Sequence, residues 1–190
     1  MQKTNTKKIM VILVIILASS LLITETTLGM LYFFEDQKHP NGDWEFEIKG
    51  EIEENMHNIS INELLTYRYI EKEYLIKGSN TYSMIFRGVS LKYLFENKVN
   101  LKENANEIRL YAQDDYMLSL NLQQVLNHPE IIIAYKKVTY KFFGLLPSSE
   151  YLEGYKNGGT GYLRLIYPRI EGIDFNGPLC LKNVVTLEIV

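Results

Sequence analysis

Cysteine is almost absent from this sequence of 190 residues, which contains only Cys180. A single cysteine cannot form a disulfide within the chain, so the folded part must depend on its hydrophobic core. Cys180 stands next to the C-terminal strand, away from the other candidate site residues, and no histidine or basic residue directly flanks it. Nothing in its sequence neighbourhood would lower its pKa, and we therefore expect a packed and unreactive thiol.

Histidine is also scarce, because the chain has only His39, His57 and His128. No two of them have a ligand spacing such as i, i+4, and none has a cysteine nearby, so surface histidine is the favoured interpretation. The sequence also lacks a nucleophile elbow and a Walker-type phosphate loop. These absences argue against a metal site of the common kind and against two widespread catalytic motifs.

The N-terminus lacks charge over residues 9–23, directly after Lys3, Lys7 and Lys8. An apolar run of this length is short for a membrane span and normal for the core of a signal peptide. The alternatives are an uncleaved signal anchor and a cleaved signal peptide with a poor cleavage site, and we favour the anchor. The predicted organisation is a basic cytoplasmic leader at 1–8, an anchor at 9–30, a tether at 31–42 and a domain at 43–190.

Both interpretations place the domain outside the cytoplasm, since the leader lysines should stay inside. The domain would be held at the cell membrane by a single pass, or secreted if the leader is cleaved. Leaving out the three leader lysines changes the net charge from −3 to −6. An acidic outer domain argues against nucleic acid as a partner and against tight adsorption to anionic lipid.

The sequence of the domain predicts an α+β fold that is mainly β. Fourteen tyrosines and eight phenylalanines favour strands, because aromatic side chains fit a pleated surface. Ser60 and Glu63 form a predicted capping box, and the helix after it should turn Leu64, Leu65 and Tyr69 inward. Short helices are expected at 60–69, 88–95 and 122–126. Strands are expected at 44–50, 74–76, 82–86, 108–112, 117–120, 131–135, 138–143, 163–167 and 184–190.

Two connections between these elements are also predicted. A turn at Lys136 and Lys137 is expected to separate the fully apolar strand 131–135, at the centre of a sheet, from a partner at 138–143. Residues 144–161 are polar and rich in glycine, serine and proline, which predicts a long loop.

Arg164 is the strongest candidate site residue, because its charge interrupts the apolar segment 163–167. Strict alternation would place its side chain on the same face as Tyr162 and Ile166. A buried arginine needs an anionic or polar partner. One candidate is a phosphate or carboxylate of a ligand, bound bidentately. The other is an internal salt bridge to an acidic residue; the candidates are Asp114, Asp115 and Glu153.

Other residues could contribute to the same candidate site around Arg164. Gly158, Gly159 and Gly161 permit a left-handed backbone and close approach by a ligand, although turn formation alone would also explain them. Lys182, just before the final strand, is either a second contact to an anion or a solvated lysine.

Seven short segments occur in an order that resembles a known family: 46–50, 60–65, 86–95, 114–116, 133–135, 161–168 and 182–184. The chain from about Asp43 to Val190 resembles the oxidoreductase molybdopterin-binding domain. This is the fold of sulfite oxidase and of related periplasmic enzymes that reduce methionine sulfoxide. The resemblance implies a sulfite-oxidase-type fold with a molybdopterin cofactor, contacted by Arg164 and more weakly by Lys182. Gly161 and Ser79 are the further candidate contacts.

The sequence departs from that family where the metal would be held. In family enzymes a cysteine thiolate binds molybdenum together with the two dithiolene sulfurs of the pterin. Ile76 stands at the equivalent position, with Ser79 as the nearest hydroxyl, and neither is a soft ligand. Thr160 replaces a frequent histidine and Asn183 replaces a tryptophan. We therefore assign no metal ligand and no catalytic residue.

Two hypotheses follow for the function. The first is a membrane-anchored oxidoreductase-like domain that still binds molybdopterin but has lost the standard molybdenum chemistry. The alternative is a non-catalytic domain that uses the same fold to bind a pterin, a small anionic ligand or a protein partner. The missing thiolate favours the second.

Overall fold

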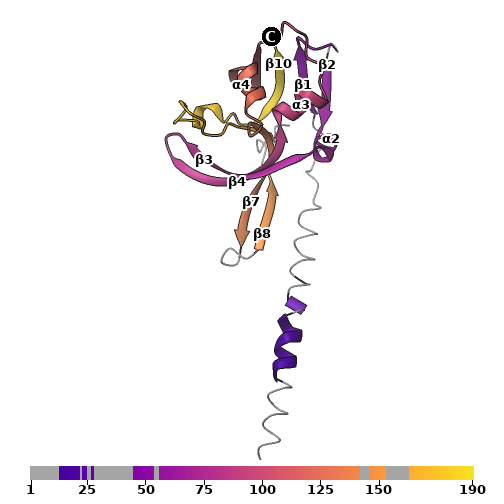
Figure 1. Cartoon of the computed structure of the whole chain (residues 1–190), viewed down its shortest axis with the longest axis vertical. Helices are drawn as coiled ribbons and strands as arrows, with labels where there is room; N and C mark the ends of the chain where they lie inside the picture. The colour runs from indigo at the N-terminus through magenta and orange to yellow at the C-terminus, as the bar shows by residue number, and fades with distance from the viewer. Residues whose placement is uncertain are drawn as a thin grey trace, which may run out of the picture. The chain divides into compact units, whose positions relative to one another are not determined.

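The computed structural model describes residues 13–21, 23–24, 27, 45–53, 56–141, 146–152 and 163–190 (Figure 1). The chain divides into two units, Met1–His39 with Tyr140–Ser148, and Pro40–Thr139 with Ser149–Val190. In the first unit residues 13–21 are helical, and their apolar side chains, such as Leu13 and Ile16, are more than half exposed. Within the described part of the chain, no helix is both long enough and apolar enough to span a bilayer.

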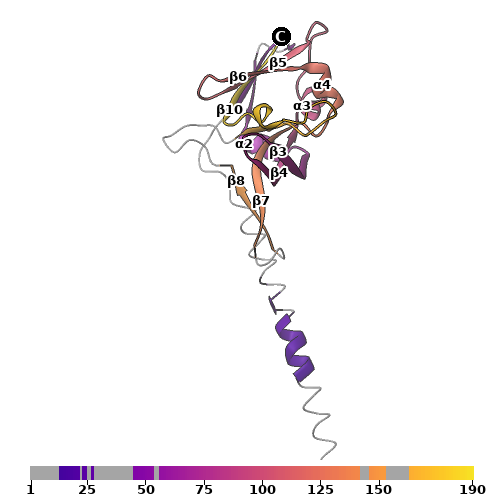
Figure 2. The ribbon, with the colours of Figure 1, turned by 90° about the vertical axis from the view of Figure 1, so that its left-hand side faces the viewer.

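Strands of the second unit make up most of two five-stranded sheets (Figures 1 and 2). The first has the order β2-β1-β10-β5-β6, in which β1 and β10 are parallel and the other pairs are antiparallel. Its strands are β1 (Glu45–Gly50), β2 (Met56–Ser60), β5 (Glu107–Ala112), β6 (Met117–Asn121) and β10 (Val184–Ile189). Parallel pairing joins the first strand of this unit to the last strand of the chain.

The second sheet has the order β3-β4-β7-β8, and a short strand, β9, also pairs with β7. Its strands are β3 (Tyr69–Lys77), β4 (Thr81–Ser90), β7 (Ile132–Lys141), β8 (Leu146–Tyr151) and β9 (Arg164–Ile166). Residues 131–135, at the start of β7, are all buried, as expected for a central strand. The observed architecture is therefore mainly β within the α+β class, as the sequence predicts.

Three short helices each begin directly after a strand, at a residue that caps them. They are α2 (Ile61–Thr66), α3 (Leu91–Asn97) and α4 (Leu122–Asn127). The caps are Ser60, Ser90 and Asn121, whose side chains accept hydrogen bonds from backbone N–H groups three residues on. Such caps satisfy donors that a helix leaves free at its start. A 3₁₀ turn, η1 (Gly177–Leu179), precedes the final strand.

The first helix is shorter than predicted. Ser60 caps it as expected, but the Glu63 carboxylate accepts a hydrogen bond from the Tyr67 hydroxyl. The backbone becomes extended at Tyr67, so Tyr69 starts β3 and is 50% exposed. The prediction that Tyr69 faces inward is wrong, because Tyr67 occupies the buried position instead.

The predicted turn at Lys136 and Lys137 is also wrong. Strand β7 continues through both lysines, which pair with Arg87 and Phe86 of β4. Lys136 is nevertheless buried, and its Nζ lies 4.4 Å from the centre of the Tyr151 ring, a cation–π contact. The expected loop at 144–161 is likewise interrupted by β8, and its remainder after Leu152 lies outside the described residues.

Candidate anion-binding cleft

Arg164 and Lys182 line one cleft of about 540 Å³. The two residues form a β-bridge, flanked by hydrogen bonds from Leu165 N–H to Leu181 O (2.8 Å) and from Val184 N–H to Leu163 O (3.0 Å). Strand β9 is thus held between β7 and the segment that leads into β10. This pairing places two cationic residues, 18 positions apart in the sequence, at the wall of the same cleft.

The turn between β5 and β6 forms another wall, to which Asp114 and Tyr116 contribute. Asp115 and Asn183 have φ angles of 62° and 54°, in the left-handed region that Asp and Asn tolerate better than most residues. The Gln113 N–H donates to Asn183 O (2.9 Å), which ties this turn to Lys182. The chain turns here between the predicted strands 108–112 and 117–120, and the turn adds one carboxylate to a cleft with two cations.

Arg164 is only partly satisfied by its neighbours. Its Nη2 donates to the Tyr82 hydroxyl at 2.9 Å, and its guanidinium lies 5.5 Å from the centre of the Phe86 ring. Its Nε is buried and has no acceptor among the described residues. No ion pair joins it to Asp114 or Asp115 in that part of the chain, and Glu153 lies outside it. The internal salt bridge is therefore not formed with either described candidate, and Tyr82 takes that place.

Cys180 lines the same cleft, which corrects the expectation that it stands away from the candidate site. The segment after η1 folds back beside β9, a placement that its position in the sequence does not indicate. The thiol is 6% exposed; its Sγ accepts from the Tyr167 N–H (3.4 Å) and donates to Tyr167 O (3.7 Å). Burial raises the pKa of the Cys180 thiol, against smaller opposing effects of the Tyr167 N–H and Arg164. A packed thiol, as predicted, forms part of the cleft wall.

Asn176, which sequence reasoning missed, anchors the segment whose next two residues, Gly177 and Pro178, line the cleft. Its fully buried side chain donates to Tyr167 O (2.7 Å) and Leu75 O (3.1 Å) and accepts from the Lys77 N–H (2.9 Å). At the next residue, Gly177, a Cβ would lie 2.7 Å from Lys77 O. The turn-forming sequence 176–178, Asn-Gly-Pro, was the available signal. These contacts dock the η1 segment against the end of β3.

The other predicted site residues that the structure describes do not line this cleft. Ile76 is 2% exposed within β3, and Ser79 lies exposed in the turn between β3 and β4. Neither lines the cleft. Gly161 and Thr160 lie outside the described residues. In the described ranges no three His, Cys, Asp or Glu side chains are grouped closely enough to hold a metal ion.

These residues fit an anion better than a molybdenum–thiolate centre. Two cations border a cleft large enough for a small ligand, and one guanidinium nitrogen is buried without an acceptor. By contrast, the chain's single thiol is already hydrogen-bonded to backbone, and Ile76, which the sequence resemblance aligns with the metal-binding cysteine of that family, lies in the core. The donor set for the metal is therefore not that of the family.

Comparison with known proteins gives a result for the fold alone. No protein-family model and no curated protein sequence matches the chain. Among solved structures, the fold resembles a sulfane dehydrogenase. That protein is SoxCD from Paracoccus pantotrophus, with a TM-score of 0.58 and 16% sequence identity. The match covers 80% of this chain and 39% of that chain, so this chain spans well under half of its length.

Proposed function

We propose that residues 43–190 form a divergent sulfite-oxidase-type domain that binds an anionic ligand between Arg164 and Lys182. The observation that carries this proposal is the bridge that joins the two cations at one cleft, with neither in an ion pair with a described residue. Arginine can bind phosphate or carboxylate bidentately, and lysine adds a second positive charge. Paired cations of this kind favour an oxyanion over a neutral ligand.

The sequence resemblance and the likeness to a sulfane dehydrogenase support molybdopterin as one candidate ligand. Arg164 and Lys182 would then hold its phosphate, and the cofactor would supply redox chemistry when bound. The missing thiolate ligand is the reason we do not assign the standard molybdenum reaction to this chain. A non-catalytic domain that binds a small oxyanion in the same cleft is the second candidate, and the core position of Ile76 favours it.

Metal and pterin analysis distinguishes the two candidates. We would purify the full chain from a host that makes and inserts the cofactor, then measure molybdenum by mass spectrometry and pterin by fluorescence after oxidation. Stoichiometric molybdenum and pterin, both lost in Arg164→Ala, would support the cofactor. Protein without either would exclude it and leave the oxyanion-binding candidate.

Calorimetric titration with phosphate, sulfate and pyrophosphate tests the cleft itself. We expect Arg164→Lys and Lys182→Gln each to weaken binding about tenfold or more, because each removes a charge-assisted contact. Arg169→Gln is the matched control, since Arg169 is exposed and pairs with Asp174 at 2.5 Å. Equal affinity in all variants, with circular dichroism showing intact folds, would refute an anion site here.

The placement at a membrane is likewise a proposal. The lysine-flanked apolar run at 9–23 supports it, as does the helix at 13–21, whose apolar side chains are exposed. A helix that is apolar on all sides is stable when lipid or protein covers it. The domain would then lie outside the cytoplasm as part of a single-pass protein. Retention of the full chain in membranes after an alkaline wash, with release on deletion of residues 1–30, is the expected result; release of the full chain would contradict it.

A further inference from the structure

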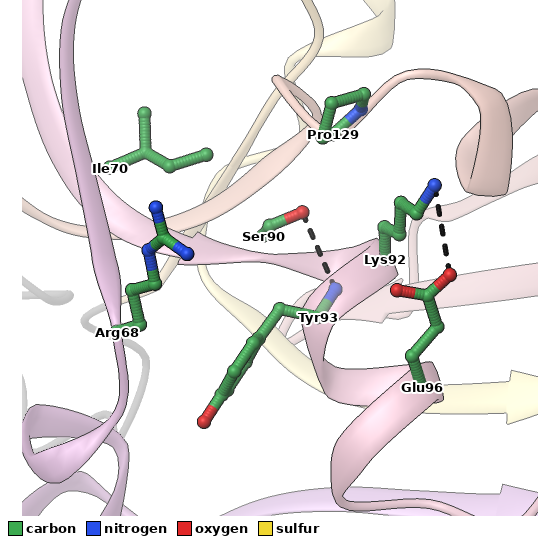
Figure 3. A pocket seen from close by; sticks show the side chains of 7 residues that line it. All are labelled: Arg68, Ile70, Ser90, Lys92, Tyr93, Glu96 and Pro129. Carbon is green, nitrogen blue, oxygen red and sulfur yellow. Dashed lines mark hydrogen bonds and ion pairs between the residues drawn. The ribbon is translucent and has the colours of Figure 1, made fainter.

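A second pocket, of about 290 Å³, lies between the start of β3 and helix α3 (Figure 3). Arg68 and Ile70 come from the β3 side, and Pro129 comes from the loop after α4. Helix α3 and its cap contribute the remaining lining residues. None of them lines the Arg164–Lys182 cleft, so this pocket is independent of the function proposed above.

Arg68 is the distinctive group of this pocket. Its guanidinium points into the space in front of Ser90, and it has no ion pair or hydrogen bond with any residue that the structure describes (Figure 3). The other arginine at this end of the second sheet is different, because Arg87 binds Glu71 at 2.6 Å. Arg68 therefore has its donors available for an oxyanion.

The other charged side chains that line the pocket determine which ligand charge it favours. Lys92 pairs with Glu96 at 3.6 Å, on the side of the pocket opposite Arg68 (Figure 3). That pair leaves the lining with a net charge of one positive unit, contributed by Arg68. A monoanion would balance this charge, whereas the second charge of a dianion would lose hydration without a counter-charge, because Lys92 is already paired with Glu96.

The remaining lining is one buried hydroxyl with apolar surface. Ser90 is 5% exposed, and its Oγ accepts from the Tyr93 N–H at 3.5 Å, which leaves its own proton to donate. Ile70, Pro129 and the Tyr93 ring supply the apolar walls. The volume is at the lower end for ligand pockets, so the ligand must be small.

We propose that this pocket binds a small organic monocarboxylate, with the carboxylate at Arg68 and Ser90 and the apolar part against Ile70, Tyr93 and Pro129. The planar guanidinium matches a carboxylate bidentately, and the Ser90 hydroxyl supplies a third donor. The apolar walls distinguish such a ligand from an inorganic anion, which would gain nothing from them.

The test uses three probes that share a benzene ring and differ in charge, titrated into the full chain and followed by ligand-observed NMR. Benzoate should bind with a dissociation constant of about 1 mM. Benzamide lacks the charge and phthalate carries a second one, and each should bind about tenfold more weakly or not at all. Equal binding of benzoate and benzamide, or no benzoate binding at about 20 mM, would overturn the proposal.

Variants locate the binding. Arg68→Gln should weaken benzoate binding about tenfold, while the control Arg169→Gln should leave it unchanged. Arg68 is exposed and has no partner to lose among the residues that the structure describes, so the variant should fold with an unchanged melting temperature. Arg68→Gln should also leave sulfate binding at the Arg164–Lys182 cleft unaffected. Loss of benzoate binding in Arg164→Lys, with retention in Arg68→Gln, would assign the probe to the other cleft and refute this one.

Discussion

At the scale of single residues, Cys180 and Arg164 show how far a cleft wall depends on partners distant in sequence. The Cys180 thiol is held by the backbone of Tyr167, and the Arg164 guanidinium by the hydroxyl of Tyr82, 82 residues earlier in the chain. Both contacts cross between segments that only the sheets bring together. The positions of both side chains in the cleft wall therefore depend on residues that do not line the cleft.

The raised pKa of Cys180 leads to a prediction about its reactivity. Only the thiolate reacts with alkylating agents, and burial disfavours the thiolate. At about pH 8 we expect iodoacetamide to modify Cys180 in the folded chain about tenfold more slowly than in denaturant, as measured by mass spectrometry. A second thiol introduced by Glu171→Cys, in an exposed turn, provides the internal control. Equal rates at the two thiols would show that Cys180 is accessible.

At the scale of elements, β4 and β7 approach each other closely at Gly88. Gly88 pairs with Ala134, next to a register shift at Arg87 and Gly88. A Cβ at Gly88 would lie 2.3 Å from Ile133 O and 2.5 Å from the Ala134 Cα. Because both atoms are backbone of a buried central strand, they cannot move aside cheaply.

Gly88→Ala should therefore destabilise the domain. We expect a loss of about 1–3 kcal/mol in the free energy of unfolding, typical of overpacking in a core, measured by urea denaturation. Gly78→Ala is the matched control, since the nearest atom to its Cβ would be 3.7 Å away, an ordinary contact. A Gly88→Ala variant as stable as Gly78→Ala would mean that the two strands are not as close as described.

At the scale of the whole molecule, stability should fall at alkaline pH. Burial raises the pKa values of Tyr74, Tyr167 and Cys180 in the folded chain. Below the unfolded pKa values, about 8.5 for cysteine and about 10 for tyrosine, both states keep these protons and the stability is complete. Above them the unfolded chain releases protons that the folded chain retains, so the stability is lost as pH rises toward the folded pKa values.

We expect the melting temperature to fall by about 5 °C or more between about pH 8 and pH 10.5, followed by circular dichroism. Tyr167→Phe should reduce this fall, because the Tyr167 ring is fully buried and its hydroxyl has no partner in the described part of the chain. A melting temperature that does not change over this interval, or the same fall in Tyr167→Phe, would contradict the prediction.

The sequence predicted those features of the fold that depend on interactions between neighbouring residues. Ser60 caps a helix where expected, β5 buries Ile108, Leu110 and Ala112 in alternation, and the chain turns between the predicted strands 108–112 and 117–120. The predicted start of the second helix was wrong, because residues 88–90 end β4 and the helix begins at Leu91. Capping, alternation and turn formation act over a few residues, so a linear pattern carries them. The same local reasoning placed a turn at Lys136 and Lys137, where a long-range cation–π contact lets the strand continue.

Which residues come together in the two sites depends on the tertiary structure. Arg164 stood out in the sequence as a charge in an apolar strand, and Lys182 was the weaker candidate. Their common cleft, Cys180 in its wall and the partner Tyr82 follow from a β-bridge and from sheet register. The pocket at Arg68 likewise needs α3 packed beside the start of β3. The periodicity of a sequence indicates which face of a helix or strand is buried. Which residue of another element lies opposite that face depends on strand register and on connections between distant segments, and no local pattern encodes these.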